Sequence, residues 1–162
     1  MNLIGQIINA MIAYYAGDVR RINHFLKVYG FAKAIGEMEG LDESTQEIIE
    51  IAALTHDIGI INSEKKYNSS AGNYQQIEGP PEAKKLLAEL GIESGVIDRV
   101  CWLIAHHHTY TDIQGIDYQI LVEADFLVNF YEDDMSIDSV HSAGGKMFKT
   151  LSGKAILNAI YS

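Results

Sequence analysis

Histidine and aspartate are adjacent at His56-Asp57, directly after a strongly apolar run that extends from Ile48 to Thr55. Two ionisable side chains at the end of a core segment need partners, because a buried charge without one costs several kcal/mol. Coordination of a metal ion would provide a partner for both, and Gly59 permits a backbone turn that lets them face one point. A capping pair is the simpler interpretation of the dipeptide alone, so the choice depends on further ligands.

Further candidate ligands lie on apolar segments elsewhere in the chain, and they are His24, Glu78, the run His106-His107-His108, and Asp125. His24 shares one helical face with Val28 and Ile35, which predicts that its side chain points into a core. Imidazole nitrogen and carboxylate oxygen together suit divalent transition metals, and separate helices can present them inside a bundle. The pattern therefore indicates a metal site shared between helices.

The apolar residues recur with helical spacing along nearly the whole chain, and alternating strand patterns with hairpin turns do not occur. We therefore predict an all-α fold, a compact bundle of seven to nine helices. One helix is expected over residues 18–39 with Asp18 as its N-cap, and the next begins near Glu43. Two short helices are expected within residues 136–162, separated near Gly153.

A polar stretch interrupts this pattern at residues 62–76 and predicts a long loop, which in a compact helical domain is often functional. Pro80 and Pro81 would then start the following helix. Lys65 and Lys66 lie in this stretch and could bind a substrate phosphate as mobile point charges. A solvated loop with no such role is the simpler alternative for the two lysines.

The length of 162 residues and the hydrophobic fraction of 48% predict a single domain, residues 1–162, with a substantial core. No apolar stretch reaches the roughly 18 residues of a membrane span, so no membrane partner is expected. The apolar run from Leu3 to Ala16 lacks a basic start and a cleavage site. We interpret it as an amphipathic helix that packs on the body or on the second subunit of a homodimer.

Charge and cysteine content narrow the possible partners and the compartment. The formal net charge of −10 disfavours binding to a nucleic acid polymer, although it does not exclude a small phosphorylated substrate. The single cysteine, Cys101, excludes an internal disulfide and fits a reducing cytoplasm.

The order His24, His56-Asp57, Asp125 resembles the pattern of the HD-domain metal-dependent phosphohydrolase family. The segments that carry the resemblance are Arg21-Ile22-Asn23-His24 followed by Val28 and Ala32, Leu54-Thr55-His56-Asp57-Ile58-Gly59, and Glu123-Ala124-Asp125. Together they span about residues 18–130. The resemblance implies an HD-domain-like helical bundle with a central metal site, to which the C-terminal helices in 136–162 are added.

The resemblance also implies the ligands. One divalent ion would be held by His24, His56, Asp57 and Asp125. Members with two ions add histidines between the central motif and the final aspartate; here His106 and His107 stand where a pair is expected, and Glu78 stands where many members have histidine. One or two ions are expected, and Fe, Mn, Ni, Co, Zn and Mg all remain candidates.

The implied activity is hydrolysis of a phosphate ester of a small molecule, a nucleotide or related metabolite, by a water molecule that the metal activates. Asp57 would bridge two ions, and Glu78 or His107 would act as general base with one. Three alternatives remain open. They are a metal-bound nucleotide sensor without turnover, a di-iron oxygenase on the same fold, and a structural module whose polar residues only satisfy one another.

Overall fold

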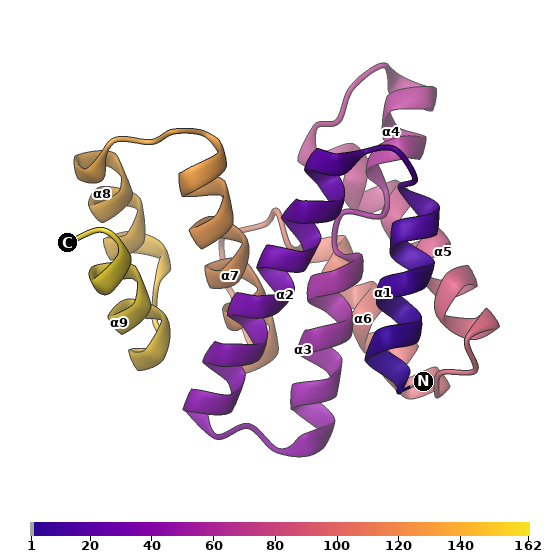
Figure 1. Ribbon diagram of the computed structural model, residues 1–162, viewed down its shortest axis with the longest axis horizontal. Helices are drawn as coiled ribbons and strands as arrows, with labels where there is room; N and C mark the ends of the chain where they lie inside the picture. Colours follow the sequence, from indigo (N-terminus) through magenta and orange to yellow (C-terminus); the bar gives the residue numbers. More distant parts are fainter. Residues whose placement is uncertain (1) are drawn as a thin grey trace.

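The computed structural model describes residues 2–162, and this part of the chain forms nine α-helices and no β-strand (Figure 1). The helices are α1 (Leu3–Tyr14), α2 (Val19–Glu39), α3 (Glu43–Thr55), α4 (Ile60–Tyr67), α5 (Gly72–Glu89), α6 (Ser94–His106), α7 (Ile116–Glu132), α8 (Ile137–Met147) and α9 (Leu151–Ile160). The predicted all-α bundle is confirmed. None of these helices is long and apolar enough to cross a membrane.

Helix α3 lies at the centre of the bundle and contacts α1, α2, α6 and α7. Its second half is buried on all sides: Ile49, Ile51 and Leu54 are fully buried, as are Ala52 and Ala53, and Glu50 is buried in an ion pair with Lys33. A helical segment with apolar residues at nearly every position has to be enclosed by other helices. This enclosure places the end of α3, where His56 and Asp57 follow, inside the protein.

The connection between α2 and α3 is short and fixes their antiparallel packing. Asp18 caps the start of α2 by accepting a hydrogen bond from Arg21 N, which confirms its predicted role. Gly40 ends that helix with a φ of 72°, a left-handed conformation that favours glycine. Asp42 then caps α3 through Thr45 N. Because the two helices run in opposite directions, the beginning of α2 lies beside the end of α3.

The N-terminal helix α1 packs on this body, with Ile7 and Met11 fully buried. The amphipathic helix expected over this part of the chain is therefore present, and its buried face contacts α3. The homodimer stays a prediction.

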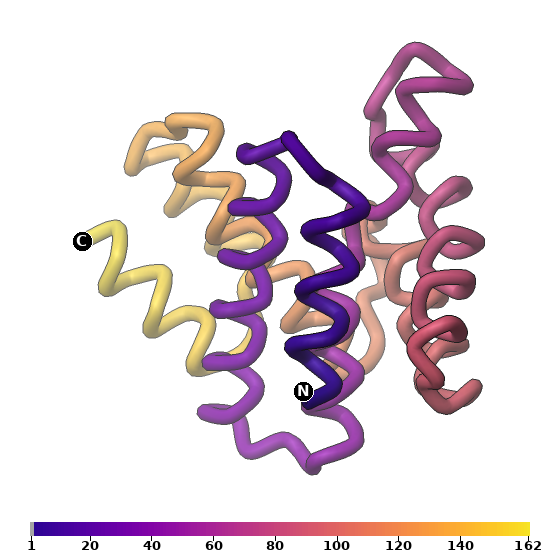
Figure 2. The backbone as a smooth tube through the Cα atoms, turned by 45° about the vertical axis from the view of Figure 1, so that its right-hand side comes forward, coloured from indigo at the N-terminus to yellow at the C-terminus, as the bar shows by residue number. Residues whose placement is uncertain are grey.

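The predicted loop over residues 62–76 is wrong, because α4 and α5 occupy most of it and only residues 68–71 connect them (Figure 2). Polar side chains stabilise these helices: Ser63 Oγ donates to Gly59 O, and the Gln75 amide donates to Ser70 O. Pro80 and Pro81 lie inside α5 and do not start it. Each proline lacks an N–H donor, so α5 loses hydrogen bonds there and depends on its packing against α6.

The last two helices, α8 and α9, pack against α7 and, through α9, against α2 (Figure 1). The break between them lies at residues 148–150, so the predicted separation near Gly153 is displaced. Gly153 belongs to the first turn of α9, where a Cβ atom would lie 2.4 Å from Glu123 Oε1. Close packing, not a helix end, explains this glycine.

Candidate metal centre

Side chains from three helices meet at the end of α3. His24 Nε2 on α2 lies 3.3 Å from Asp57 Oδ2 and 3.2 Å from Asp125 Oδ1 on α7. His56 Nε2 lies 3.3 Å from His24 Nε2 and 3.3 Å from Asp57 Oδ2. The structure thus brings together the four residues expected to hold one ion, and three of them, His24, His56 and Asp57, have ligand atoms within 4.8 Å of one another.

A tight turn lets His56 and Asp57 face the same point although they are adjacent in sequence. His56 keeps helical angles at the C-terminal end of α3, and Ile58 N then donates to Thr55 O at 3.0 Å. The Asp57 carbonyl accepts hydrogen bonds from the Tyr15 hydroxyl at 2.5 Å and from Ile60 N at 3.0 Å. These bonds fix the backbone where it turns from α3 into α4.

The outward ring nitrogens of two histidines fix which nitrogen carries the proton. His56 Nδ1 donates to Ala53 O at 2.7 Å, and His107 Nδ1 donates to Ile104 O at 2.7 Å. A carbonyl oxygen only accepts, so each Nδ1 carries a hydrogen and each neutral ring presents an Nε2 lone pair inward. This is the arrangement of metal-ligating histidines.

His24 is oriented in the same way by a carboxylate that the sequence analysis missed. Its Nδ1 contacts Glu132 Oε1 at 2.5 Å, and the Glu132 side chain is mostly buried. Glu132 lies seven residues after Asp125 on α7, a spacing that returns to the same helical face. That spacing was the available signal. A second residue on this face, Asn129, donates to Asp125 Oδ1 at 3.1 Å.

The second histidine group centres on His107, whose Nε2 is buried and has no hydrogen-bond partner in residues 2–162. This atom lies 3.5 Å from Asp57 Oδ1. A buried ring nitrogen that faces a carboxylate without a hydrogen bond is unfavourable unless a proton or a metal ion satisfies both atoms. A divalent ion therefore fits these residues. Asp57, His107 and His108 form a further group whose ligand atoms lie within 4.8 Å of one another.

The structure does not bring His106 to the cluster and brings His108 instead. Successive side chains on a helix point about 100° apart, so His107 and His106 cannot both face inward. The His106 ring stacks on Trp102 at 3.9 Å between centroids, and its Nδ1 donates to Trp102 O. His108 follows the end of α6, and its Nε2 lies 3.0 Å from Gln75 Oε1.

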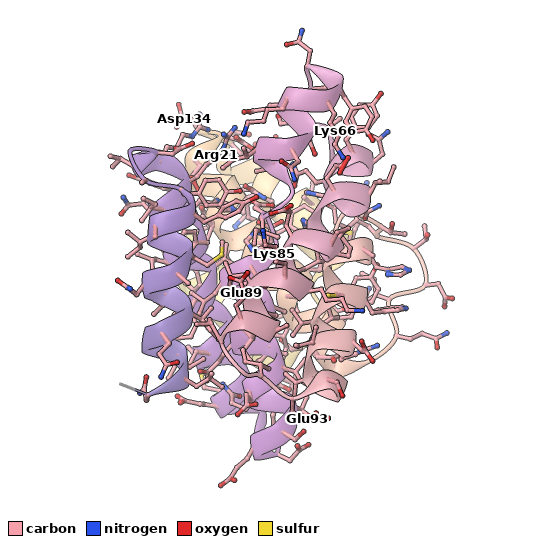
Figure 3. The ribbon with its side chains drawn as sticks, turned by 90° about the vertical axis from the view of Figure 1, so that its right-hand side faces the viewer. Arg21, Lys66, Lys85, Glu89, Glu93 and Asp134 are labelled. Carbon is pink, nitrogen blue, oxygen red and sulfur yellow. The ribbon has the colours of Figure 1, made fainter. Side chains whose placement is uncertain are left out.

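Glu78 is also engaged elsewhere. It is buried, and it pairs with Lys66 Nζ at 2.8 Å and accepts from the Tyr67 hydroxyl at 3.3 Å. It belongs to neither group of possible metal ligands among the described residues. Lys66 lies at the same end of the molecule as Arg21 (Figure 3), whereas Lys65 is exposed on α4 without an ion pair in the described chain.

In the absence of a metal, the carboxylates of the cluster favour the protonated, positively charged form of His24 and His56. Burial disfavours the charged form of His24, but its contacts with Asp125 and Asp57 outweigh this effect and raise its pKa to about 10. Burial is likewise outweighed at His56, where Asp57 and Asp125 raise the pKa well above its usual value. Burial would raise the pKa of Asp57 and of Asp125, yet the histidines lower both.

His108 behaves differently from His24 and His56. Burial, together with the nearby His107, lowers the pKa of His108 to about 4. A neutral imidazole at neutral pH can act as a ligand or as a hydrogen-bond partner without first losing a proton.

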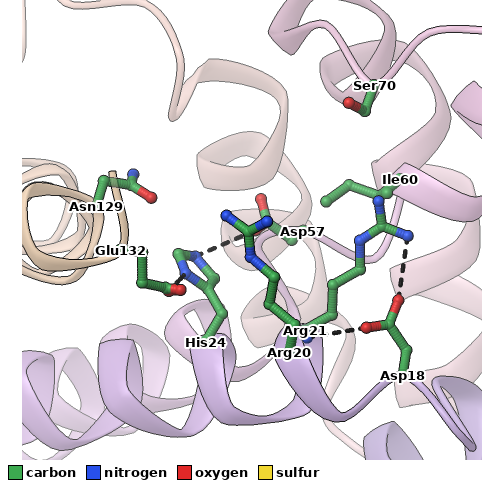
Figure 4. Close-up of a pocket in the computed structure, with 9 residues that line it drawn as sticks. All are labelled: Asp18, Arg20, Arg21, His24, Asp57, Ile60, Ser70, Asn129 and Glu132. Atoms are coloured by element: carbon green, nitrogen blue, oxygen red, sulfur yellow. Dashed lines mark hydrogen bonds and ion pairs between the residues drawn. The ribbon is translucent and has the colours of Figure 1, made fainter. Parts of the chain in front are cut away.

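A pocket of about 460 Å³ opens beside the cluster, and His24 and Asp57 form part of its wall (Figure 4). The other lining residues are Asp18, Arg20, Arg21, Ile60, Ser70, Asn129 and Glu132. The pocket lies between the start of α2, the start of α4 and the end of α7. A small molecule can therefore reach the candidate metal ligands from solvent.

Comparisons with known proteins identify the family and the fold. A family model described as HD domain matches residues 21–140. The crystal structure of a predicted HD superfamily hydrolase from an uncultured Thermotogales bacterium is similar, with a TM-score of 0.69 and 20% identity over 99% of this chain and 91% of that chain. This likeness shows the fold. A search of curated proteins found no significant match.

The matched residues include His24, the His56-Asp57 pair and Asp125, and they make up most of the chain. The resemblance seen in the sequence is thereby confirmed. The chain belongs to the HD domain family.

Proposed function

We propose that the protein is a metal-dependent phosphohydrolase that acts on a phosphate ester of a small molecule, with nucleotides and related metabolites among the candidates. HD domains are typically metal-dependent hydrolases. The observation that carries the proposal is the convergence of His24, His56 and His107 on Asp57, with each Nδ1 engaged outward. Around this carboxylate, the Nε2 atoms of His24 and His56 bind protons when no metal is present, and the three rings together have the ligand types that a divalent cation needs.

His24, His56, Asp57 and Asp125 would hold one divalent ion. Asp57, His107 and His108 would support a second. Bound there, the ion would lower the pKa of a water molecule from about 15.7 toward ~7 and would offset charge on a phosphoryl oxygen. In the reaction, the water oxygen bonds to phosphorus, the ester P–O bond breaks, and the leaving alcohol takes up a proton.

The residues of the chain position these groups and move the proton. Glu132 holds the ring of His24, as the carbonyls of Ala53 and Ile104 hold the other two rings. If only the first ion is bound, His108, which is neutral near pH 7, would be a candidate for proton transfer along with His107. Glu78 could serve as a base only after separating from Lys66.

The test is hydrolysis of a phosphomonoester and phosphodiester panel by protein loaded with Mn, Fe, Co, Ni, Zn or Mg. The substitution Asp57→Asn keeps the shape of the side chain but removes its charge. We expect it to lower kcat/KM by about 100-fold or more, because it removes a ligand shared by both groups. Metal content, measured by elemental analysis, should fall in the same variant.

The matched control is Glu47→Gln on the same helix, an exposed carboxylate at the other end of α3. It should leave activity unchanged. Full activity in Asp57→Asn would refute the mechanism. Binding of phosphate esters without any product would instead favour a sensor.

A further inference from the structure

The pocket beside the cluster contains two arginines whose surroundings differ. Arg21 is held by carboxylates on both sides, with Nη1 at 3.2 Å from Asp18 Oδ2 and Nη2 at 2.5 Å from Glu64 Oε1. Its charge is therefore offset within the protein. Arg20 lines the same pocket and is exposed, and its side chain forms no hydrogen bond or ion pair within residues 2–162. Figure 4 shows its guanidinium turned into the pocket, on the side of His24 and Asp57.

A cation left unpaired in a pocket beside acidic groups is suited to an anion that comes from solution. A guanidinium presents five donors in a planar fork that matches phosphate oxygens in pairs. A phosphate monoester carries between one and a half and two negative charges near pH 7, since its second pKa is about 6, whereas a diester carries one. A cationic side chain outside the metal centre would therefore favour a monoester over a diester, because the monoester carries the larger negative charge.

The walls of the pocket constrain the alcohol part of such an ester. Ile60 is the one aliphatic residue among those that line it, and no tyrosine, phenylalanine or tryptophan does. A nucleobase is usually bound by stacking on an aromatic side chain, and this pocket provides none. Ser70 and Asn129 instead offer hydrogen-bonding groups to hydroxyls.

Resting on the proposed function, we propose that Arg20 binds the phosphoryl group of a phosphate monoester whose alcohol part is compact and rich in hydroxyl groups, such as a sugar phosphate. Arg21 has a structural role, because its ion pairs with Asp18 and Glu64 connect α2 to α4 and shape the pocket wall. Arg20 is then a specificity residue that distinguishes monoesters from diesters.

The experiment compares wild type, Arg20→Gln and Arg20→Lys, all loaded with Mn²⁺. Binding of inorganic phosphate is measured by calorimetry, so that one readout is independent of turnover. Loss of a charge-assisted hydrogen-bonding group should weaken phosphate binding by about 10- to 100-fold in Arg20→Gln. Arg20→Lys should recover part of the affinity, because it keeps the charge but not the fork.

Kinetics provide the second readout. In Arg20→Gln, KM for a sugar phosphate should rise by the same factor while kcat changes much less, and hydrolysis of bis(p-nitrophenyl) phosphate should not change. Lys149→Gln, an exposed lysine at the opposite end of α2 from the pocket, is the control for the lost positive charge and should match wild type.

The outcomes separate this inference from the proposed function. If wild type hydrolyses monoesters and Arg20→Gln still binds phosphate as tightly as wild type, Arg20 has no such role and the inference is overturned. A higher kcat/KM for 5′-mononucleotides than for sugar phosphates would overturn the assignment of the alcohol part. If neither wild type nor any variant hydrolyses an ester, but Arg20→Gln loses phosphate binding, the proposed hydrolase function is refuted. The assignment of Arg20 as an anion-binding residue is then kept.

Discussion

Both ring nitrogens of His24 contact carboxylates. Its Nε2 faces Asp57 and Asp125, and its Nδ1 faces Glu132. The outer carboxylate fixes the ring orientation and makes the imidazole a stronger donor to a metal, as outer partners of metal-bound histidines usually do. Glu132 should therefore influence metal affinity without contacting the ion.

We expect Glu132→Gln to weaken Mn²⁺ binding by about 10- to 100-fold, the usual cost of losing an outer partner of a ligand. The glutamine keeps the size of the side chain, so the fold should be retained. Metal affinity is measured by calorimetric titration. Asp133→Asn, the exposed neighbour, is the control. Equal affinities in wild type and Glu132→Gln would show that the contact is only structural.

Residue types and order predicted the inner part of the site, because His24, His56, Asp57 and Asp125 lie on segments whose helical character is clear. The choice between His106, His107 and His108 was beyond the sequence. It depends on which side of α6 faces the cluster at the end of the helix, and tertiary packing decides this. Glu132 could have been found from its spacing to Asp125, whereas nothing in the sequence shows that Arg20 is unpaired.

The turn between α3 and α4 packs directly against the backbone of α5. A Cβ atom on Gly59 would lie 2.6 Å from Gly79 N and 2.7 Å from Gln75 O. Gly59 has a φ of −77°, so its conformation is open to any residue and its small size is what the fold requires. From the sequence we expected Gly59 to allow an unusual backbone turn. The structure shows that Gly59 is needed because a larger side chain would not fit.

Gly59→Ala should destabilise the protein by about 1–3 kcal/mol, because backbone atoms must move to admit the methyl group. Urea unfolding followed by circular dichroism gives the free energy of unfolding. Gly30→Ala is the matched comparison, since no atom lies within 4 Å of its added Cβ on α2. That variant should be more stable by about 0.5–1 kcal/mol. Equal stability of wild type and Gly59→Ala would contradict the close approach.

The same region shows why part of the fold escaped prediction. Residues 62–76 are polar, and polar composition without apolar periodicity is typical of a loop. In the folded protein Ser63 and Gln75 are buried and bonded to backbone carbonyls. Helix formation there depends on contacts with distant segments, which a local pattern does not contain. Helices α2, α3 and α7 were predictable because they carry their own apolar faces.

Across the whole molecule, the cluster connects α2, α3 and α7, with His107 added from α6. Without a metal, His24 keeps a proton because its pKa is about 10 in the folded state, compared with 6.5 for an unperturbed histidine. That proton stabilises the metal-free fold below about pH 6.5, and the stabilisation is lost as the pH rises through 10. A metal ion has to displace the same proton, so its affinity should rise with pH over this range.

We expect the difference in Tm between Mn²⁺-loaded and chelated protein to grow from pH 6 to pH 8.5. A free metal concentration 100 times Kd stabilises the fold by about 2.7 kcal/mol. For a protein of this size that corresponds to a shift of roughly 5–10 °C. Differential scanning calorimetry with and without chelator measures it. Asp57→Asn should show a much smaller shift, and a shift in wild type that shrinks as the pH rises would contradict the competition between proton and metal.

The distance along the chain between the ligands has a consequence for biosynthesis. His24, His56 and Asp57 leave the ribosome before Asp125 and Glu132, the α7 residue that orients His24. A nascent chain therefore lacks the full ligand set until α7 has emerged and docked against α2. Binding of an ion at the candidate centre would then follow assembly of the bundle, because a half-synthesised chain lacks the complete ligand set.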